Sequence, residues 1–205
     1  PIAADSPPPP GEQTPLVGNE VFFGEKARGD GSNIVAVNNV VSIYHDIQEG
    51  DDLRLRELVT EMESAGVQLR SVMFWKNDGG ALGTAMDIGK FIRSKRANTA
   101  VAGYPTDDGV PPHCASACVY AFAGGVERTI YLPARIGMHQ ASLADGSDGT
   151  MDDGQRVVAE KYQYLSAMGI DPEMVIEGSK RSPDEMWWFT PYEAKGYGLA
   201  TRIIK

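Results

Sequence analysis

The hydrophobic positions of this chain repeat with two alternating spacings. Runs of β-branched residues predict strands over 34–47, around an Asn38-Asn39 turn, and over 67–75. Apolar residues three and four apart predict helices over 53–66 and 81–92. The same patterns predict further strands at 99–103, 129–132, 136–139 and 201–204, and further helices at 116–122, 155–168, 172–178 and 191–197. This alternation predicts an α/β fold with a largely parallel sheet.

The N-terminal residues lack this periodicity and are rich in proline, with a run from Pro7 to Pro10. Proline fixes φ and has no N–H, so we expect an extended segment at 1–20 before one domain at 21–205. The chain starts with Pro1 rather than Met. A removed signal sequence explains this start and predicts a periplasmic or secreted protein, and a truncated sequence is the other explanation.

Composition narrows the classes of partner. The chain has 205 residues, of which 42% are hydrophobic and 23% charged, as expected for a globular domain. Its net charge of −9 disfavours binding to nucleic acid and to anionic membrane surfaces. No apolar run approaches the length of about 18 residues that a membrane span needs.

A pair of glycines joins a predicted strand to a predicted helix in the sequence Asn77-Asp78-Gly79-Gly80. Glycines allow positive φ and close approach of a ligand to the backbone. The first N–H groups of the following helix have no partner within it, so they bind negative charge well. This motif is either a binding site for an oxyanion or an ordinary tight turn.

Ser116 lies between small residues in the sequence Cys114-Ala-Ser-Ala-Cys118, at the start of an apolar segment. A serine at a helix N-terminus is stabilised as an alkoxide by the helix dipole, and the N–H of Ala117 would be a second oxyanion donor. The alternative is a serine that caps a core helix. His139 ends a short predicted strand, where it is either a general base or a structural side chain.

In order and spacing, these motifs resemble the Clp protease proteolytic subunit of the ClpP/crotonase superfamily and its envelope-located bacterial relatives. The resemblance covers about residues 33–205 and also includes Thr190–Ala194 and Tyr197–Leu199. It implies a spiral of β-β-α units and a serine hydrolase of the peptidase type that acts on a peptide or protein. It further implies a nucleophile at Ser116, a base at His139, an oxyanion hole at Gly79, Gly80 and Ala117, no metal or organic cofactor, and a homo-oligomer.

The chain departs from this family where the acidic third member of a catalytic triad is expected. A gapless reading puts Met186 there, so Asp184, or else Glu185, is the candidate acid, and Asp184 is alternatively a helix cap. The bulky pair Trp187-Trp188 crowds or lines the cleft. A Ser–Lys dyad with Lys161 is a further option, against a solvated helix face for that lysine. Two other functions stay open, namely an inactive ClpP-like scaffold or binding module in the cell envelope and a crotonase-like enzyme for acyl-CoA.

The two cysteines flank the proposed nucleophile. Residues four apart in a helix have Cα atoms about 6 Å apart, within the range of a disulfide. In an exported chain a disulfide between Cys114 and Cys118 would lock the turn, and two buried thiols are the alternative. His113 with both thiols makes a zinc site conceivable, although the spacing is unusual. An acidic cluster that lacks the EF-hand pattern is a solvated loop or a calcium site: Asp145, Asp148, Asp152 and Asp153.

Overall fold

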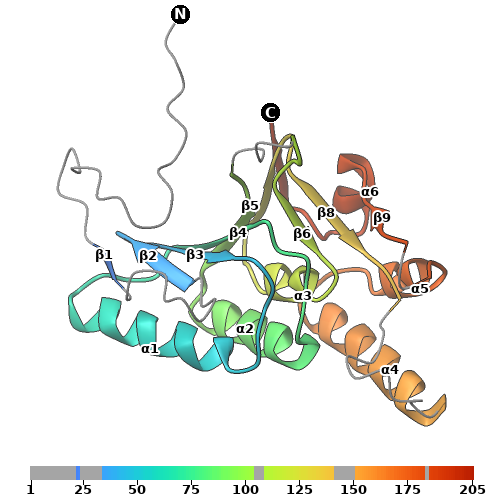
Figure 1. Ribbon diagram of the computed structural model, residues 1–205, viewed down its shortest axis with the longest axis horizontal. Coiled ribbons are helices and arrows are strands. Elements are labelled where there is room, and N and C mark those ends of the chain that lie inside the picture. The colour runs from blue at the N-terminus through green and yellow to red at the C-terminus, as the bar shows by residue number, and fades with distance from the viewer. Residues whose placement is uncertain (1–21, 24–33, 104–108, 141–150, 183–184) are drawn as a thin grey trace, which may run out of the picture.

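The computed structural model describes residues 22–23, 34–103, 109–140, 151–182 and 185–205. In chain order the elements are β1 (Phe22–Phe23), β2 (Ile34–Val37), β3 (Val40–Tyr44), α1 (Asp51–Ser64), β4 (Ser71–Trp75), α2 (Leu82–Ser94), β5 (Asn98–Val101), β6 (His113–Ala115), α3 (Cys118–Ala123), β7 (Arg128–Tyr131), β8 (Arg135–Met138), α4 (Met151–Ala167), α5 (Glu173–Ser179), β9 (Trp187–Trp188), α6 (Pro191–Gly196) and β10 (Arg202–Ile204). The predicted alternation of strands and helices is confirmed (Figure 1).

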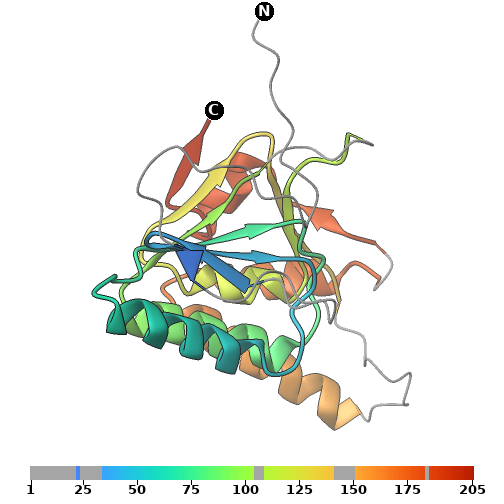
Figure 2. The same cartoon turned by 60° about the vertical axis from the view of Figure 1, so that its left-hand side comes forward.

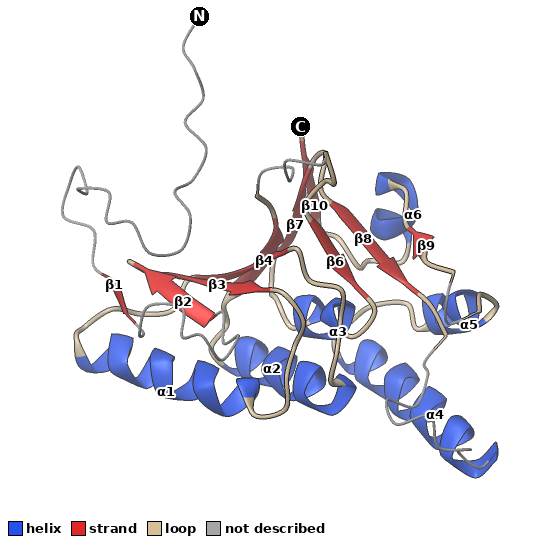
Figure 3. Ribbon diagram, in the orientation of Figure 1, coloured by secondary structure: helices blue, strands red, loops and turns tan. Residues whose placement is uncertain are grey.

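The larger sheet has the strand order β1-β2-β3-β4-β5-β7-β10. Its strands from β3 to β10 pair in parallel, and only β1 and β2 join antiparallel. Side chains on one face of β3 and β4 are completely buried, among them Val41, Val72 and Phe74. Helices α1, α2 and α3 lie along one side of this sheet (Figure 3), which explains why these strands are rich in apolar residues.

Helix α3 is held firmly against α2. A Cβ atom on Gly124 would overlap the backbone of Gly89, so the two helices approach more closely than larger residues would permit. The guanidinium of Arg93 on α2 donates to the carbonyls of Ala123, Gly124, Gly125 and Met168. These bonds fix the C-terminal end of α3, and they thereby help to fix the turn that precedes the helix. Figure 2 shows α1 and α2 side by side beneath the sheet.

A second sheet with the order β6-β8-β9 stands beside the larger one. Strands β6 and β8 are parallel, with Ala115 opposite Gly137, whereas β9 is antiparallel to β8. Helix α4 extends away from both sheets (Figure 1). Its C-terminal part is attached to α3 by the Tyr164 hydroxyl, which donates to the carbonyl of Tyr120 at 2.6 Å. No helix in the described ranges is long and apolar enough to cross a membrane.

Several predicted boundaries were wrong. The strand predicted over 67–75 begins at Ser71, and the helix predicted from Gln155 begins at Met151. Strands β6 and β9 were not predicted, because strands of three and two residues have too little alternation to detect and depend on pairing with β8. The proline-rich segment at 1–20, Asp145, Asp148 and Asp184 lie outside the described residues.

Candidate active site

Ser116 occupies a sharp turn between β6 and α3. Its φ is 52°, in the left-handed region that residues other than glycine seldom adopt. The N–H of Ser116 donates to the carbonyl of Gly137 at 2.9 Å, which ties the turn to β8. Ser116 is half-buried and precedes α3, which begins at Cys118, so it belongs to the turn rather than to the predicted helix over 116–122. A hydroxyl in such a strand–turn–helix bend projects from the backbone toward a ligand.

His139 lies beside this serine, with its Nε2 atom 2.9 Å from Ser116 Oγ. The register of the small sheet produces the contact. Because Ala115 pairs with Gly137 in parallel strands, the residues that follow the two strands emerge at the same edge of the sheet. The serine hydroxyl can donate to Nε2 when that nitrogen carries no proton, which is the arrangement that a general base requires.

The other ring nitrogen of His139 is buried, and its Nδ1 has no hydrogen-bond partner among the described residues. Asp184, the residue predicted to orient this ring, falls outside those residues. Glu185, the second candidate, is exposed and lies 3.4 Å from the guanidinium of Arg181. The Glu185 carboxylate therefore forms a surface ion pair and does not meet His139, so that alternative is wrong.

The glycine turn packs directly against the serine. Gly79 and Gly80 have φ values of 122° and 103°, and a Cβ atom on Gly79 would lie 2.7 Å from Ser116 Cβ. The N–H of Gly79 already donates to the side-chain oxygen of Asn77 at 3.1 Å. Across the described part of the chain, no acceptor engages the N–H groups of Gly80 and Ala117. Of the three predicted oxyanion residues, Gly80 and Ala117 are thus able to donate to a ligand. Gly79 has no side chain, which lets the turn pack against Ser116.

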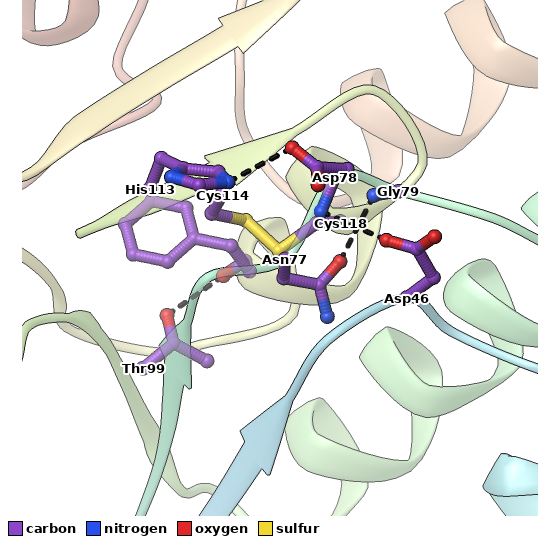
Figure 4. Close-up of a disulfide and its surroundings, with 9 residues drawn as sticks. Asp46, Asn77, Asp78, Gly79, Thr99, His113, Cys114 and Cys118 are labelled. Carbon is purple, nitrogen blue, oxygen red and sulfur yellow. Dashed lines mark hydrogen bonds and ion pairs between the residues drawn. A yellow bond between two sulfur atoms is a disulfide. The ribbon is translucent and has the colours of Figure 1, made fainter. Parts of the chain in front are cut away.

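A disulfide joins Cys114 and Cys118, with Cα atoms 5.3 Å apart, and confirms the predicted bond. Cys114 lies in β6 rather than in a helix, so the bond bridges the turn instead of one helical turn of α3 (Figure 4). It consumes both thiols that the zinc hypothesis needs. No cluster of three metal-ligating side chains occurs within the described ranges.

Two aromatic residues and a histidine border the nucleophile turn. Trp187 pairs with Met138 and Trp188 with Gly137, which places β9 against β8, the strand that precedes His139. His113 lies at the start of β6, its ring 6.0 Å from that of Trp188 in an edge-to-face contact. Its Nε2 is 2.9 Å from the Asp78 carboxylate of the glycine turn (Figure 4). The sequence did not predict this contact between His113 and Asp78, because it depends on the position of β6, a strand that was not predicted.

Lys161 on α4 is buried, contrary to the expected solvated helix face, with 7% of its surface exposed. Its ammonium lies 5.7 Å from the centre of the Tyr120 ring. Burial disfavours the charged form and lowers the pKa of Lys161 to about 8. The hydrogen bond of Ser116 Oγ within the described residues goes to His139, so the geometry favours imidazole over this amine as the base.

Comparison with known proteins concerns the fold. No protein-family model and no curated protein matches the chain. Among solved structures, ClpP1 from Listeria monocytogenes is similar, with a TM-score of 0.62 and 18% identity over 82% of this chain and 92% of that one. The chain has a ClpP-like fold. The ClpP protease catalytic domain from Plasmodium falciparum has a TM-score of 0.57 and 17% identity over 82% of this chain and 85% of that one.

A further ClpP-like neighbour is a mutant of the membrane-bound stomatin-specific protease 1510-N. Its TM-score is 0.57 and its identity 18%, over 80% of this chain and 77% of that one. The TM-scores show a shared fold, and they confirm the fold that the resemblance implied. The chemistry of the site depends on the geometry of its own residues.

Proposed function

We propose that the chain is a serine hydrolase of the peptidase type, with Ser116 as nucleophile and His139 as general base. The observation that carries the proposal is the 2.9 Å separation between His139 Nε2 and Ser116 Oγ. The solved structures with the same fold include proteases, which supports a peptide or protein substrate. The two unengaged N–H groups at Gly80 and Ala117 support acyl transfer, because that reaction develops negative charge on a carbonyl oxygen.

The proposed reaction begins when Ser116 Oγ bonds to the carbonyl carbon while its proton passes to His139 Nε2. The carbonyl π electrons move onto oxygen, where Gly80 and Ala117 donate hydrogen bonds. Collapse of this intermediate breaks the C–N bond, and the departing amine takes the proton from His139. Water then attacks the acyl ester with His139 again as base, which releases the acid and restores Ser116.

We also propose that Asp184 accepts a hydrogen bond from His139 Nδ1. If the Ser116 hydroxyl donates to Nε2, the neutral ring carries its proton on Nδ1. That nitrogen is buried without a partner among the described residues, and an unsatisfied buried donor costs about 1–3 kcal/mol. A carboxylate there would remove this cost and would also stabilise the imidazolium that forms during the reaction.

The location and assembly of the chain are proposals as well. The disulfide between Cys114 and Cys118 supports an oxidising compartment, hence a periplasmic or secreted protein. For the proposed homo-oligomer, the shallow groove along α4 that Val158, Ala159 and Tyr162 line is the candidate contact surface. Sedimentation velocity of the purified chain checks this assembly.

The test combines covalent labelling with turnover. Wild-type protein should react with a fluorophosphonate probe at one site between about pH 6 and 9, and it should cleave a denatured protein substrate. Ser116→Ala should abolish labelling, whereas Ser166→Ala, at an exposed serine of α4, should leave it unchanged. Asp184→Asn should lower turnover by about 10⁴-fold, and Glu185→Gln should have little effect.

Two outcomes would count against this proposal. A folded wild type that neither labels nor cleaves any substrate would favour the inactive scaffold instead. Labelling that persists in Ser116→Ala would place the reactive group elsewhere in the chain. A separate result bears on Asp184 alone. If Asp184→Asn and Glu185→Gln lowered turnover equally, Asp184 would be removed from the site and the assignment of Ser116 would stand.

A further inference from the structure

The glycine turn is held on one flank by the segment that connects β3 to α1. The N–H of Asp78 donates to the Asp46 carboxylate at 3.1 Å. The N–H of Ile47 donates to the carbonyl of Gly79 at 2.7 Å, and Ala81 donates to the carbonyl of Ile47 at 2.9 Å. These bonds fix the height of the turn relative to the larger sheet. At its first residue the turn is also tied to β6, because the N–H of Asn77 donates to the carbonyl of His113 at 3.1 Å and the carbonyl of Asn77 accepts from the N–H of Ala115 at 2.8 Å.

The side chain of His113 adds a second connection between β6 and the turn, one residue further along at Asp78. Its Nε2 lies 2.9 Å from Asp78 Oδ1, and its Nδ1 lies 3.1 Å from the carbonyl oxygen of Pro111. Both partners are acceptors only, so both ring nitrogens have groups to which an N–H can donate. The histidine side chain is 12% exposed, whereas that of Asp78 is 77% exposed, so a largely buried ring binds an exposed carboxylate.

The ring of His113 is fixed because it is packed on its other side. Trp188 contacts it edge to face at 6.0 Å, and Trp188 is paired with Gly137 of β8. The carbonyl of Gly137 accepts from the N–H of Ser116 at 2.9 Å. His113 thus contacts the glycine turn through Asp78 and the strand of the general base through Trp188. It also lies in β6, the strand that precedes Ser116.

We propose that the His113–Asp78 pair positions the oxyanion turn, by setting the N–H of Gly80 relative to Ser116 Oγ. The proposal rests on the proposed hydrolase function and names two positioning residues that do not touch the reacting atoms. A backbone donor acts only if it meets the oxyanion as it forms, so a small displacement of the turn lowers kcat more than it raises KM.

The first test is a double-mutant cycle on kcat and KM. His113→Ala should lower kcat about 10- to 100-fold with KM changed by less than about threefold, because one donor is displaced rather than removed. Asp78→Ala should have a similar effect, and the double variant should lose little more than either single one. His113→Gln, whose amide can still donate to Asp78, should recover most of the rate. Additive losses, or no recovery with glutamine, would overturn the proposal.

The second test does not need turnover. Hydrogen exchange of the Ile47 and Ala81 amides, which bond along the turn, should accelerate about tenfold in His113→Ala because the turn opens more often. Lys90→Ala is the matched control, since it breaks an exposed ion pair with Asp87 on the nearby helix α2. Unchanged exchange and unchanged kcat would refute the positioning role. An inactive wild type would refute the hydrolase, and exchange would then decide whether His113 holds the turn.

Discussion

Reducing the disulfide between Cys114 and Cys118 should destabilise the protein by an amount that its short loop predicts. The two cysteines are separated by 4 positions, and both are completely buried. In the chain-entropy description, closing a loop of this size lowers the entropy of the unfolded chain enough to stabilise the fold by about 2 kcal/mol. A longer loop would contribute more, so this value is near the lower end for native disulfides.

Urea unfolding followed by tryptophan fluorescence, with and without a phosphine reductant, measures this difference. The midpoint of thermal unfolding should fall by about 4–8 °C in a domain of this size. The variant Cys114→Ala/Cys118→Ala should be at least as unstable as the reduced protein and should not respond to reductant, because it also loses two buried sulfur atoms. A loss below about 0.5 kcal/mol on reduction would refute the entropic reasoning, as would a reductant effect on the double variant.

Two further predictions concern a backbone contact and a buried charge. Gly79→Ala should cost more than about 2 kcal/mol and abolish probe labelling, since its Cβ would lie 2.7 Å from Ser116 Cβ at a φ of 122°. Gly83→Ala, whose Cβ would meet nothing within 4 Å, should leave both unchanged or slightly raise stability, and calorimetry compares the two. Because burial lowers the pKa of Lys161 from 10.5 to about 8, the unfolded chain binds the extra proton between these values. The free energy of unfolding of the wild type should therefore rise across that window by up to about 3 kcal/mol relative to Lys161→Met. Urea unfolding at several pH values measures this difference, and the same pH dependence in both proteins would contradict the prediction.

The sequence determined the elements whose side chains alternate with a clear period. Helix α2 was predicted because its buried residues, including Ala85, Ile88 and Ile92, repeat at helical spacing. Strands β3 and β4 were predicted from their β-branched and aromatic residues. Local spacing also suggested the disulfide, because residues four apart in a helix have Cα atoms about 6 Å apart, and the observed turn gives a similar separation of 5.3 Å. These features depend on residues close together in the chain, so the sequence alone carries them.

Only the tertiary structure decided which distant residues meet. Ser116 reaches His139 because β6 pairs with β8 in one register, and a shift by one residue would turn these side chains to opposite faces. The contact between His113 and Asp78 spans 35 positions and depends on the short strand β6. The burial of Lys161 depends on how α4 packs on α3, where its ammonium meets the Tyr120 ring. Pairing and packing are chosen by the burial of the whole core, whereas periodicity reports only the local environment of each segment.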